Sequence, residues 1–156
     1  MNTILGNLLS EAQIITDLRA TDRWEAIEEL ITNLVVTGLV KSEDRDAVSG
    51  AVRKREMSMS TGIGYGIGVP HASTELVPNA VAAFGRSKQK INFDSLDAQP
   101  VTLVFLFLVP RGQLQKHLHT MSDIAKLFRS ADIRQALEQA PDAAAILRIF
   151  RGHQSS

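Results

Sequence analysis

The sequence predicts an α/β fold in which helices cover both faces of a β-sheet. Helical and extended patterns alternate along the chain, and this alternation is typical of layered α/β architectures. The run Val101 to Val109 (VTLVFLFLV) consists almost entirely of Val, Leu and Phe, as expected of a central strand buried on both faces. A length of 156 residues suits one domain. We therefore expect a single domain over 1–156, with a frayed tail over 152–156.

The N-terminal part of the chain is expected to form a short strand followed by an amphipathic helix. Isoleucines and a leucine over 14–18 indicate the strand. Apolar residues then recur at intervals of three and four over 24–35, which is the stripe of a helix that packs on a core. Thr21 or Asp22 can cap the first turn of this helix, and Gly38 can end it.

A second helix is expected to begin near Ser42. Serine suits the N-cap position, and the two acidic residues that follow it suit the positive end of the helix dipole. Val48 and Val52 indicate the apolar face. Three cations over 53–55 fall at the C-terminal end, where the dipole favours positive charge.

The segment from Ser60 to His71 (STGIGYGIGVPH) places glycine at alternate positions over 62–68. In an extended chain this pattern leaves one face apolar and the other bare. Bare backbone lets a ligand or a neighbouring strand approach closely. The segment does not match the G-x-G-x-x-G pattern of dinucleotide-binding proteins, and it lacks the Gly-Lys-Ser/Thr that closes a P-loop. We therefore expect no nucleotide cofactor.

The C-terminal half adds further strands and helices. Val81 to Gly85 indicates a strand that precedes the central one. A long helix is expected after Gly112. Its predicted buried stripe comprises Leu114, Leu118, Met121, Ala125 and Phe128. Ser130 can begin another helix, and Pro141 suits the start of a last one over 143–150.

Composition and charge exclude several classes of function. The chain has 17 Lys and Arg against 17 Asp and Glu, a formal net charge of +0, which argues against binding nucleic acid through its phosphates. It contains no cysteine, so disulfides, thiolate catalysis and Cys-ligated zinc are excluded. No segment has the length of a membrane helix or the pattern of a signal peptide. We expect a cytoplasmic protein without membrane insertion.

Histidine is the side chain best suited to proton or phosphoryl chemistry near neutral pH. Pro70 fixes its own φ and favours an extended conformation at Val69, so His71 is held at a defined point. His117 borders the predicted stripe of its helix, whereas His119 lies nearer to solvent. Taken singly, such histidines more often have a structural role. A zinc site built from His71 and His117 has no supporting motif, and we expect no metal.

Several motifs in a fixed order resemble one family. They are Arg55-Glu56, Ser60-Thr61-Gly62-Ile63-Gly64, Gly68-Val69-Pro70-His71, Gly85-Arg86-Ser87, Ile91-Asn92-Phe93-Asp94, the Val101 to Val109 strand and His117-Leu118. Together they resemble IIA proteins of the fructose and mannitol class of the phosphoenolpyruvate-dependent sugar phosphotransferase system, which includes the stand-alone nitrogen-regulatory IIA proteins. The likeness covers most of the chain. It departs from many members at 72–74, which bears on the choice of partner.

The resemblance implies a mixed β-sheet covered by helices on both faces, and a phosphotransferase activity through a phosphohistidine. It implies that His71 is the phosphoryl acceptor, modified on Nε2, and that His117 is the second active-site histidine. Arg55 matches the family's arginine before the glycine-rich segment, and Thr61 matches the threonine of its motif. Arg55, His117 and Thr61 would bind the phosphoryl group, whose charge spreads over three equatorial oxygens during transfer.

The resemblance leaves two functions open. In the first, the chain accepts phosphate from the phosphocarrier HPr or its nitrogen-branch counterpart and regulates a kinase or transporter through its phosphorylation state. In the second, it is the IIA component of a fructose- or mannitol-type transporter and passes phosphate to a separate IIB protein. No IIB domain or membrane segment follows the IIA-like region, which favours the regulatory type. Neither function needs a cofactor or nucleic acid, and both belong to the bacterial cytoplasm.

Overall fold

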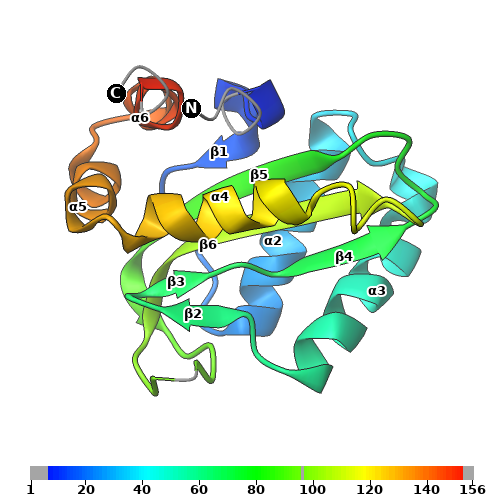
Figure 1. The fold of residues 1–156 in the computed structure, drawn as a ribbon, viewed down its shortest axis with the longest axis horizontal. Helices are drawn as coiled ribbons and strands as arrows, with labels where there is room; N and C mark the ends of the chain where they lie inside the picture. The colour runs from blue at the N-terminus through cyan, green and yellow to red at the C-terminus, as the bar shows by residue number, and fades with distance from the viewer. Residues whose placement is uncertain (1–6, 96, 153–156) are drawn as a thin grey trace.

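A computed structural model of the protein describes residues 7–95 and 97–152. Within these residues, a six-stranded sheet lies between two layers of helices (Figure 1). The strands are β1 (Ile14–Ile15), β2 (Gly62–Gly64), β3 (Ile67–Gly68), β4 (His71–Thr74), β5 (Val81–Ile91) and β6 (Val101–Pro110). The helices are α2 (Arg23–Val36), α3 (Arg45–Ser58), α4 (Leu118–Arg129), α5 (Ala131–Gln139) and α6 (Ala143–Gly152), with 3-10 turns η1 (Glu11–Gln13) and η2 (Ser42–Asp44). The predicted α/β class is confirmed.

The sheet is mixed, and β6 lies at its centre. The strand order is β1-β5-β6-β3-β2, and β4 also pairs with β6. β5 runs antiparallel to β6, whereas β3 and β4 run parallel to it. All residues of β6 except Thr102 are buried, so the predicted central strand is confirmed. The sequence pattern did not indicate β4, because a strand of four residues that follows Pro70 is too short to show alternation.

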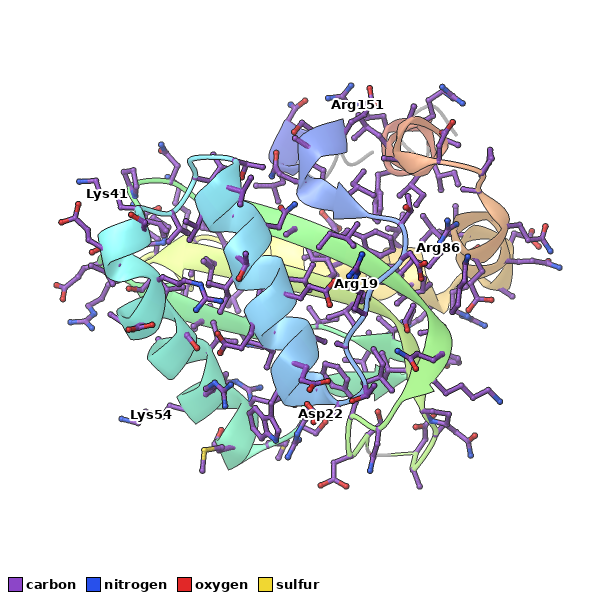
Figure 2. The ribbon with its side chains drawn as sticks, turned by 180° about the vertical axis from the view of Figure 1, so that it is seen from behind. Arg19, Asp22, Lys41, Lys54, Arg86 and Arg151 are labelled. Carbon is purple, nitrogen blue, oxygen red and sulfur yellow. The ribbon has the colours of Figure 1, made fainter. Side chains whose placement is uncertain are left out.

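The two faces of the sheet carry separate hydrophobic cores. α2 and α3 cover one face, in front of the sheet in Figure 2. We call this the charged face, because buried and half-buried ion pairs lie along it. α4, α5 and α6 cover the other face, which we call the aromatic face. Its core holds five phenylalanines: Phe84, Phe105, Phe107, Phe128 and Phe150.

The glycine-rich segment folds into a hairpin and not into one extended stretch. β2 and β3 pair antiparallel around a two-residue turn at Tyr65 and Gly66. Both residues have positive φ, 59° and 79°, as a type I′ hairpin turn requires. The bare face is filled by the chain itself, because a Cβ at Gly68 would lie 2.7 Å from the Phe93 ring. The glycines therefore admit a neighbouring loop and leave no room for a ligand on that side.

Most helix ends follow the predicted signals. Asp22 caps α2, its Oδ1 accepting the Glu25 N–H at 2.8 Å, and Gly38 adopts φ 81° just after it. Ser130 caps α5 through its hydroxyl. Ser42 does not cap the second helix: it lies within η2, and α3 begins only at Arg45. The first turn after 41 is too tight to be α-helical, which moves the start by one turn.

The predicted stripe of the long helix is partly wrong. Leu114 and Leu118 are 40% and 53% exposed, because turns around Gly112, with φ 83°, delay the start of α4 to Leu118. The buried residues of α4 are Thr120, Ile124, Leu127 and Phe128. α6 begins at Ala143, and it includes Gly152, where we expected fraying to begin. The rest of the predicted tail, 153–156, lies outside the described residues.

Candidate functional site

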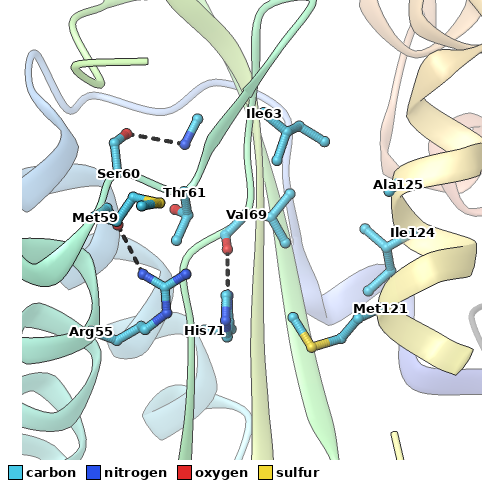
Figure 3. A pocket seen from close by; sticks show the side chains of 11 residues that line it. Arg55, Met59, Ser60, Thr61, Ile63, Val69, His71, Met121, Ile124 and Ala125 are labelled. Atoms are coloured by element: carbon cyan, nitrogen blue, oxygen red, sulfur yellow. Dashed lines mark hydrogen bonds between the residues drawn. The ribbon is translucent and has the colours of Figure 1, made fainter. Parts of the chain in front are cut away.

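His71 stands at the first position of β4, where two parallel strands set its place. It is aligned with Phe107 of β6, and the Phe107 N–H donates to the Pro70 carbonyl at 3.0 Å. Aligned residues of paired strands share a face, so the His71 side chain lies on the aromatic face, towards α4 (Figure 3). The backbone around Pro70 therefore fixes the imidazole before any ligand arrives.

The imidazole of His71 is held in one tautomer. Nδ1 lies 2.9 Å from the Val69 carbonyl oxygen, and because a carbonyl only accepts, Nδ1 carries the hydrogen. Burial lowers the pKa of His71, the Val69 hydrogen bond raises it, the Arg55 guanidinium lowers it and the Glu56 carboxylate raises it, with a net decrease. The ring is therefore neutral at pH 7, and Nε2 has a free lone pair.

Two pockets meet at His71 and Arg55. The first, of about 320 Å³, lies between the glycine-rich hairpin and α4. Its lining is mainly apolar and includes Met59, Ile63 and Met121 besides the imidazole of His71 (Figure 3). Such a surface suits an apolar side chain of a partner protein. A phosphoryl group is better matched by a pocket that holds several cations.

The second pocket, of about 460 Å³, is basic. Lys54, Arg55 and Arg111 line it together with Ser58 and Ser73. Among the described residues that line it, none is acidic, although Arg111 has Glu75 at 3.7 Å. Three cations and the Ser73 hydroxyl lie beside a neutral histidine, whereas the Ser58 hydroxyl already donates to the Arg55 carbonyl at 2.7 Å. Such a set of donors matches the chemistry of a doubly charged anion.

Arg55 projects from the last turns of α3 to the edge of both pockets. Its Nη1 donates to the Met59 carbonyl at 2.8 Å. Within residues 7–95 and 97–152, no carboxylate lies within ion-pair distance of Arg55. Its charge is therefore available to an anion bound in either pocket.

Thr61 lies beside this site, but its hydroxyl is engaged elsewhere. The side chain is buried, and Oγ1 donates to Oε1 of Glu56 at 2.5 Å. The Thr61 N–H donates to Oε2 of the same carboxylate at 3.0 Å. We expected this hydroxyl to donate a hydrogen bond to a phosphoryl group. The observed arrangement differs, because its single proton is already donated to Glu56.

His117 is the residue just before α4 rather than part of the helix. Its ring packs edge-on against Phe107, with 6.0 Å between the ring centroids. Since His71 is aligned with Phe107, both histidines flank one phenylalanine. His117 lines neither of the two pockets that contain His71. It is partly buried and His119 is exposed, as expected, although His117 lies before the helix and not on its buried stripe.

Sequence reasoning missed Glu56 and three residues of the basic pocket, Lys54, Ser73 and Arg111. A signal for Arg111 existed, because parallel strands carry their C-terminal ends to the same edge of a sheet. β4 and β6 are parallel, and Arg111 follows β6 directly. Without β4 in the prediction, this signal was lost.

Residues 7–95 and 97–152 contain neither a metal-binding cluster nor a membrane-spanning helix. No group of three His, Cys, Asp or Glu side chains there could hold a metal ion. None of the helices in residues 7–95 and 97–152 is long and apolar enough to cross a membrane.

Comparison with known proteins identifies the family. Residues 7–152 match the family described as "Phosphoenolpyruvate-dependent sugar phosphotransferase system, EIIA 2". The fructose-specific EIIABC component of the phosphotransferase system of Bacillus subtilis is 38% identical over 149 residues, which are 96% of this chain but 23% of that protein. The nitrogen regulatory protein of Bradyrhizobium diazoefficiens is 33% identical over 147 residues, which are 94% of each chain.

A solved structure agrees with these sequence matches. The nitrogen regulatory protein IIA-Ntr from Neisseria meningitidis has a TM-score of 0.85 and 29% identity, covering 94% of this chain and 99% of that one. The resemblance seen in the motifs is confirmed, and this chain belongs to the EIIA type 2 family of the phosphoenolpyruvate-dependent sugar phosphotransferase system.

Proposed function

We propose that this chain is a phosphoryl carrier whose His71 accepts a phosphoryl group on Nε2 from the phosphohistidine of HPr or its nitrogen-branch counterpart. The observation that carries the proposal is the bond of 2.9 Å from Nδ1 to the Val69 carbonyl. It leaves Nε2 as a nucleophile between an apolar pocket and a basic one. Phosphoenolpyruvate, which feeds the relay, is a cytoplasmic metabolite, so the proposed location is the cytoplasm.

The reaction is an in-line displacement at phosphorus. The Nε2 lone pair forms the new N–P bond while the N–P bond of the donor histidine breaks, and the donor nitrogen keeps the bonding pair. The His71 ring gains the positive charge that the donor ring loses. The Val69 carbonyl accepts the Nδ1–H bond and stabilises this charge. No proton has to move during the transfer.

The phosphoryl oxygens need positive charge placed in advance. Arg55 supplies it from α3, and Lys54 and Arg111 add to it across the basic pocket. We propose that His117 makes a further contact once a partner is bound, because its ring packs against Phe107, the residue aligned with His71 on the neighbouring strand. Thr61 contributes through the loop that it anchors to Glu56.

Exposed apolar side chains support docking of a protein partner at this site. Met59 and Ile63, 59% and 40% exposed, line the first pocket with His71, and Leu114, 40% exposed, lines the second. Large apolar side chains around a charged centre are typical of protein interfaces. HPr or its nitrogen-branch counterpart is the proposed donor that docks there.

The primary proposal is a regulatory role, in which the phosphorylation state controls binding to a kinase or transporter. The nitrogen regulatory relative and this chain match over nearly their full lengths, which favours this role. Phosphorylation adds about −1.5 to −2 charges at one point, a change that a partner can detect. The alternative is a transport role with transfer to a separate IIB protein, favoured by the match to the fructose-specific EIIABC component.

The test is phosphorylation in a reconstituted relay. The chain is mixed with phosphoenolpyruvate, enzyme I and either HPr or its nitrogen-branch counterpart, and its intact mass is followed. We expect one added phosphoryl group, none on His71→Ala, and slower addition to His117→Ala. His119→Ala is the matched control, because it removes an exposed histidine from α4. Phosphate on His71→Ala, or none on the wild type with either carrier, would refute the proposal.

The two roles are separated by a second mixture. The phosphorylated chain is incubated with a purified fructose-type IIB protein, and the phosphate on each protein is followed. Rapid and complete transfer to IIB supports the transport role. Retention of the phosphoryl group, together with binding of a kinase or transporter to only one phosphorylation state, supports regulation.

A further inference from the structure

Glu56 is a buried carboxylate directly behind the proposed site. Its side chain is 0% exposed. It accepts hydrogen bonds from both the N–H and the hydroxyl of Thr61, at 3.0 and 2.5 Å. Arg23 of α2 completes its environment, with Nη1 at 3.3 Å from Oε2. A buried charge is tolerated only with such partners. The hydrogen bonds from Thr61 therefore stabilise the buried Glu56 carboxylate, and the carboxylate in turn holds the loop that contains Thr61.

Consecutive residues of α3 hold the loop after the helix from two sides. From the outside, Arg55 donates to the Met59 carbonyl at 2.8 Å. From the inside, Glu56 accepts from Thr61. The position of the Met59 carbonyl therefore depends on the Thr61 anchor two residues later. The Arg55 guanidinium, in turn, is oriented by that carbonyl.

The same loop is also hydrogen-bonded to Phe93, in the segment that follows β5. Ser60 Oγ donates to the Phe93 carbonyl at 2.6 Å and accepts the Gly62 N–H at 3.1 Å. Arg23 also reaches the Phe93 carbonyl, at 3.4 Å. Arg23, Glu56, Ser60 and Thr61 thus form one network with the Phe93 carbonyl, which we call the loop anchor.

We infer that Glu56 is a positioning residue for phosphoryl transfer: through Thr61 it fixes the loop whose Met59 carbonyl aims the Arg55 guanidinium at His71. This inference rests on the proposed function. Glu56 does not face the basic pocket and touches no reacting atom. Loss of the carboxylate frees the loop and lets the guanidinium move, and misplacement of a charge-stabilising group by about 1 Å can cost roughly 100-fold in rate.

The test measures single-turnover phosphoryl transfer from phosphorylated HPr to Glu56→Gln, well below its melting temperature. We expect a rate constant about 10- to 100-fold below wild type. Glu28→Gln is the matched control, because Glu28 also links α2 and α3, to Ser49 and to Arg53 at 2.8 Å, without touching the loop. Thr61→Ser, which keeps a donor hydroxyl, is expected to lose less rate than Thr61→Val.

A double-mutant cycle separates positioning from general support of the fold. If Glu56 acts through Arg55, Glu56→Gln changes the rate by less than about 2-fold in an Arg55→Ala background. As a readout independent of transfer, the Arg55 Nε–Hε group is expected to become more mobile by NMR relaxation in Glu56→Gln, but not in Glu28→Gln.

Three outcomes overturn the inference while leaving the carrier function intact. They are a folded Glu56→Gln that transfers at the wild-type rate, equal losses in the wild-type and Arg55→Ala backgrounds, and an Arg55 side chain whose mobility does not change. A wild-type chain that accepts no phosphate is a different result, because it refutes the proposed function itself.

Discussion

The two faces of the sheet are stabilised by different chemistry. On the aromatic face, Phe84, Phe105, Phe128 and Phe150 contact one another, with ring centroids 5.1 to 6.4 Å apart. On the charged face, the fully buried core is aliphatic apart from Phe93, and the partly buried Trp24 packs against it. Arg23 with Glu56 and Arg53 with Glu28 lie along the helices of this face.

This difference assigns separate tasks to the two faces. Ring packing gives stability without reactive groups. The charged face supplies Arg55, because Lys54 and Arg55 at the end of α3 line the basic pocket together with His71. His71 itself points to the aromatic face, so the proposed site lies where the two chemistries meet. Substitutions on the aromatic face are therefore expected to alter stability alone. Substitutions around the loop anchor on the charged face are expected to alter both stability and the rate of phosphoryl transfer.

The largest expected effect on stability is on the aromatic face. Phe105 is fully buried and lies 6.2 and 6.0 Å from the rings of Phe128 and Phe150. Phe105→Ala is expected to lower the free energy of unfolding by about 4 kcal/mol, measured by urea denaturation. The transfer rate at low temperature stays near wild type, and a rate that falls in parallel with stability would contradict the separation of tasks.

Breaking the loop anchor is expected to have the next largest effect. Arg23→Met leaves the Glu56 carboxylate buried without its cation, and this is expected to cost about 3 kcal/mol of unfolding free energy. Adding Glu56→Gln in the same chain removes the stranded charge, so part of the loss should return. Denaturation of the single and double variants measures both changes. Additive losses would show that the two side chains do not interact.

A smaller effect is expected from pH, at the junction of the two faces. Burial lowers the pKa of His71 in the folded protein below the unfolded value of about 6.5. The unfolded state then binds more protons in this range, so stability rises with pH up to about 6.5 and falls as the solution is acidified below it. Denaturation of wild type and His71→Gln between pH 5 and 8 isolates this contribution, and identical profiles would exclude it.

The smallest effect is expected from the half-exposed charges between α2 and α3. Glu28 contacts Arg53 at 2.8 Å and Arg45 at 3.5 Å, and all three side chains are 26% to 42% exposed. Solvent screens such pairs, so Glu28→Gln is expected to cost at most about 1 kcal/mol and to leave transfer unchanged. A loss as large as that of Arg23→Met would remove the distinction between buried and exposed pairs.

The sequence predicted the elements whose signals are local. The Val101 to Val109 strand, the Asp22 cap and the Gly38 end of α2 each depend on a few adjacent residues, and all three are confirmed. The family motifs also identified Arg55 and His71 as neighbours before the fold was known, and both line the same two pockets.

The features that sequence patterns did not predict depend on distant contacts. One face of the glycine-rich hairpin is closed because Ser95 and Phe93 fill the space beside Gly62 and Gly68. Which residues of α4 are buried depends on where the preceding turns end and the helix begins. The spacing of apolar residues alone does not determine that starting point. Glu56 entered the sequence analysis only as part of the Arg55-Glu56 motif, and its burial was not indicated because its partner Arg23 lies 33 positions away.

The loop anchor also determines when the site forms during folding. Arg23 bonds to Glu56 across 33 positions and to the Phe93 carbonyl across 70, and Ser60 spans 33 to reach the same carbonyl. Contacts of such long sequence separation form late, because loop closure must precede them. A nascent chain still lacking Phe93, or one that has opened locally, has no arranged site. In the proposed function, acceptance of phosphate therefore requires that these distant contacts have already formed.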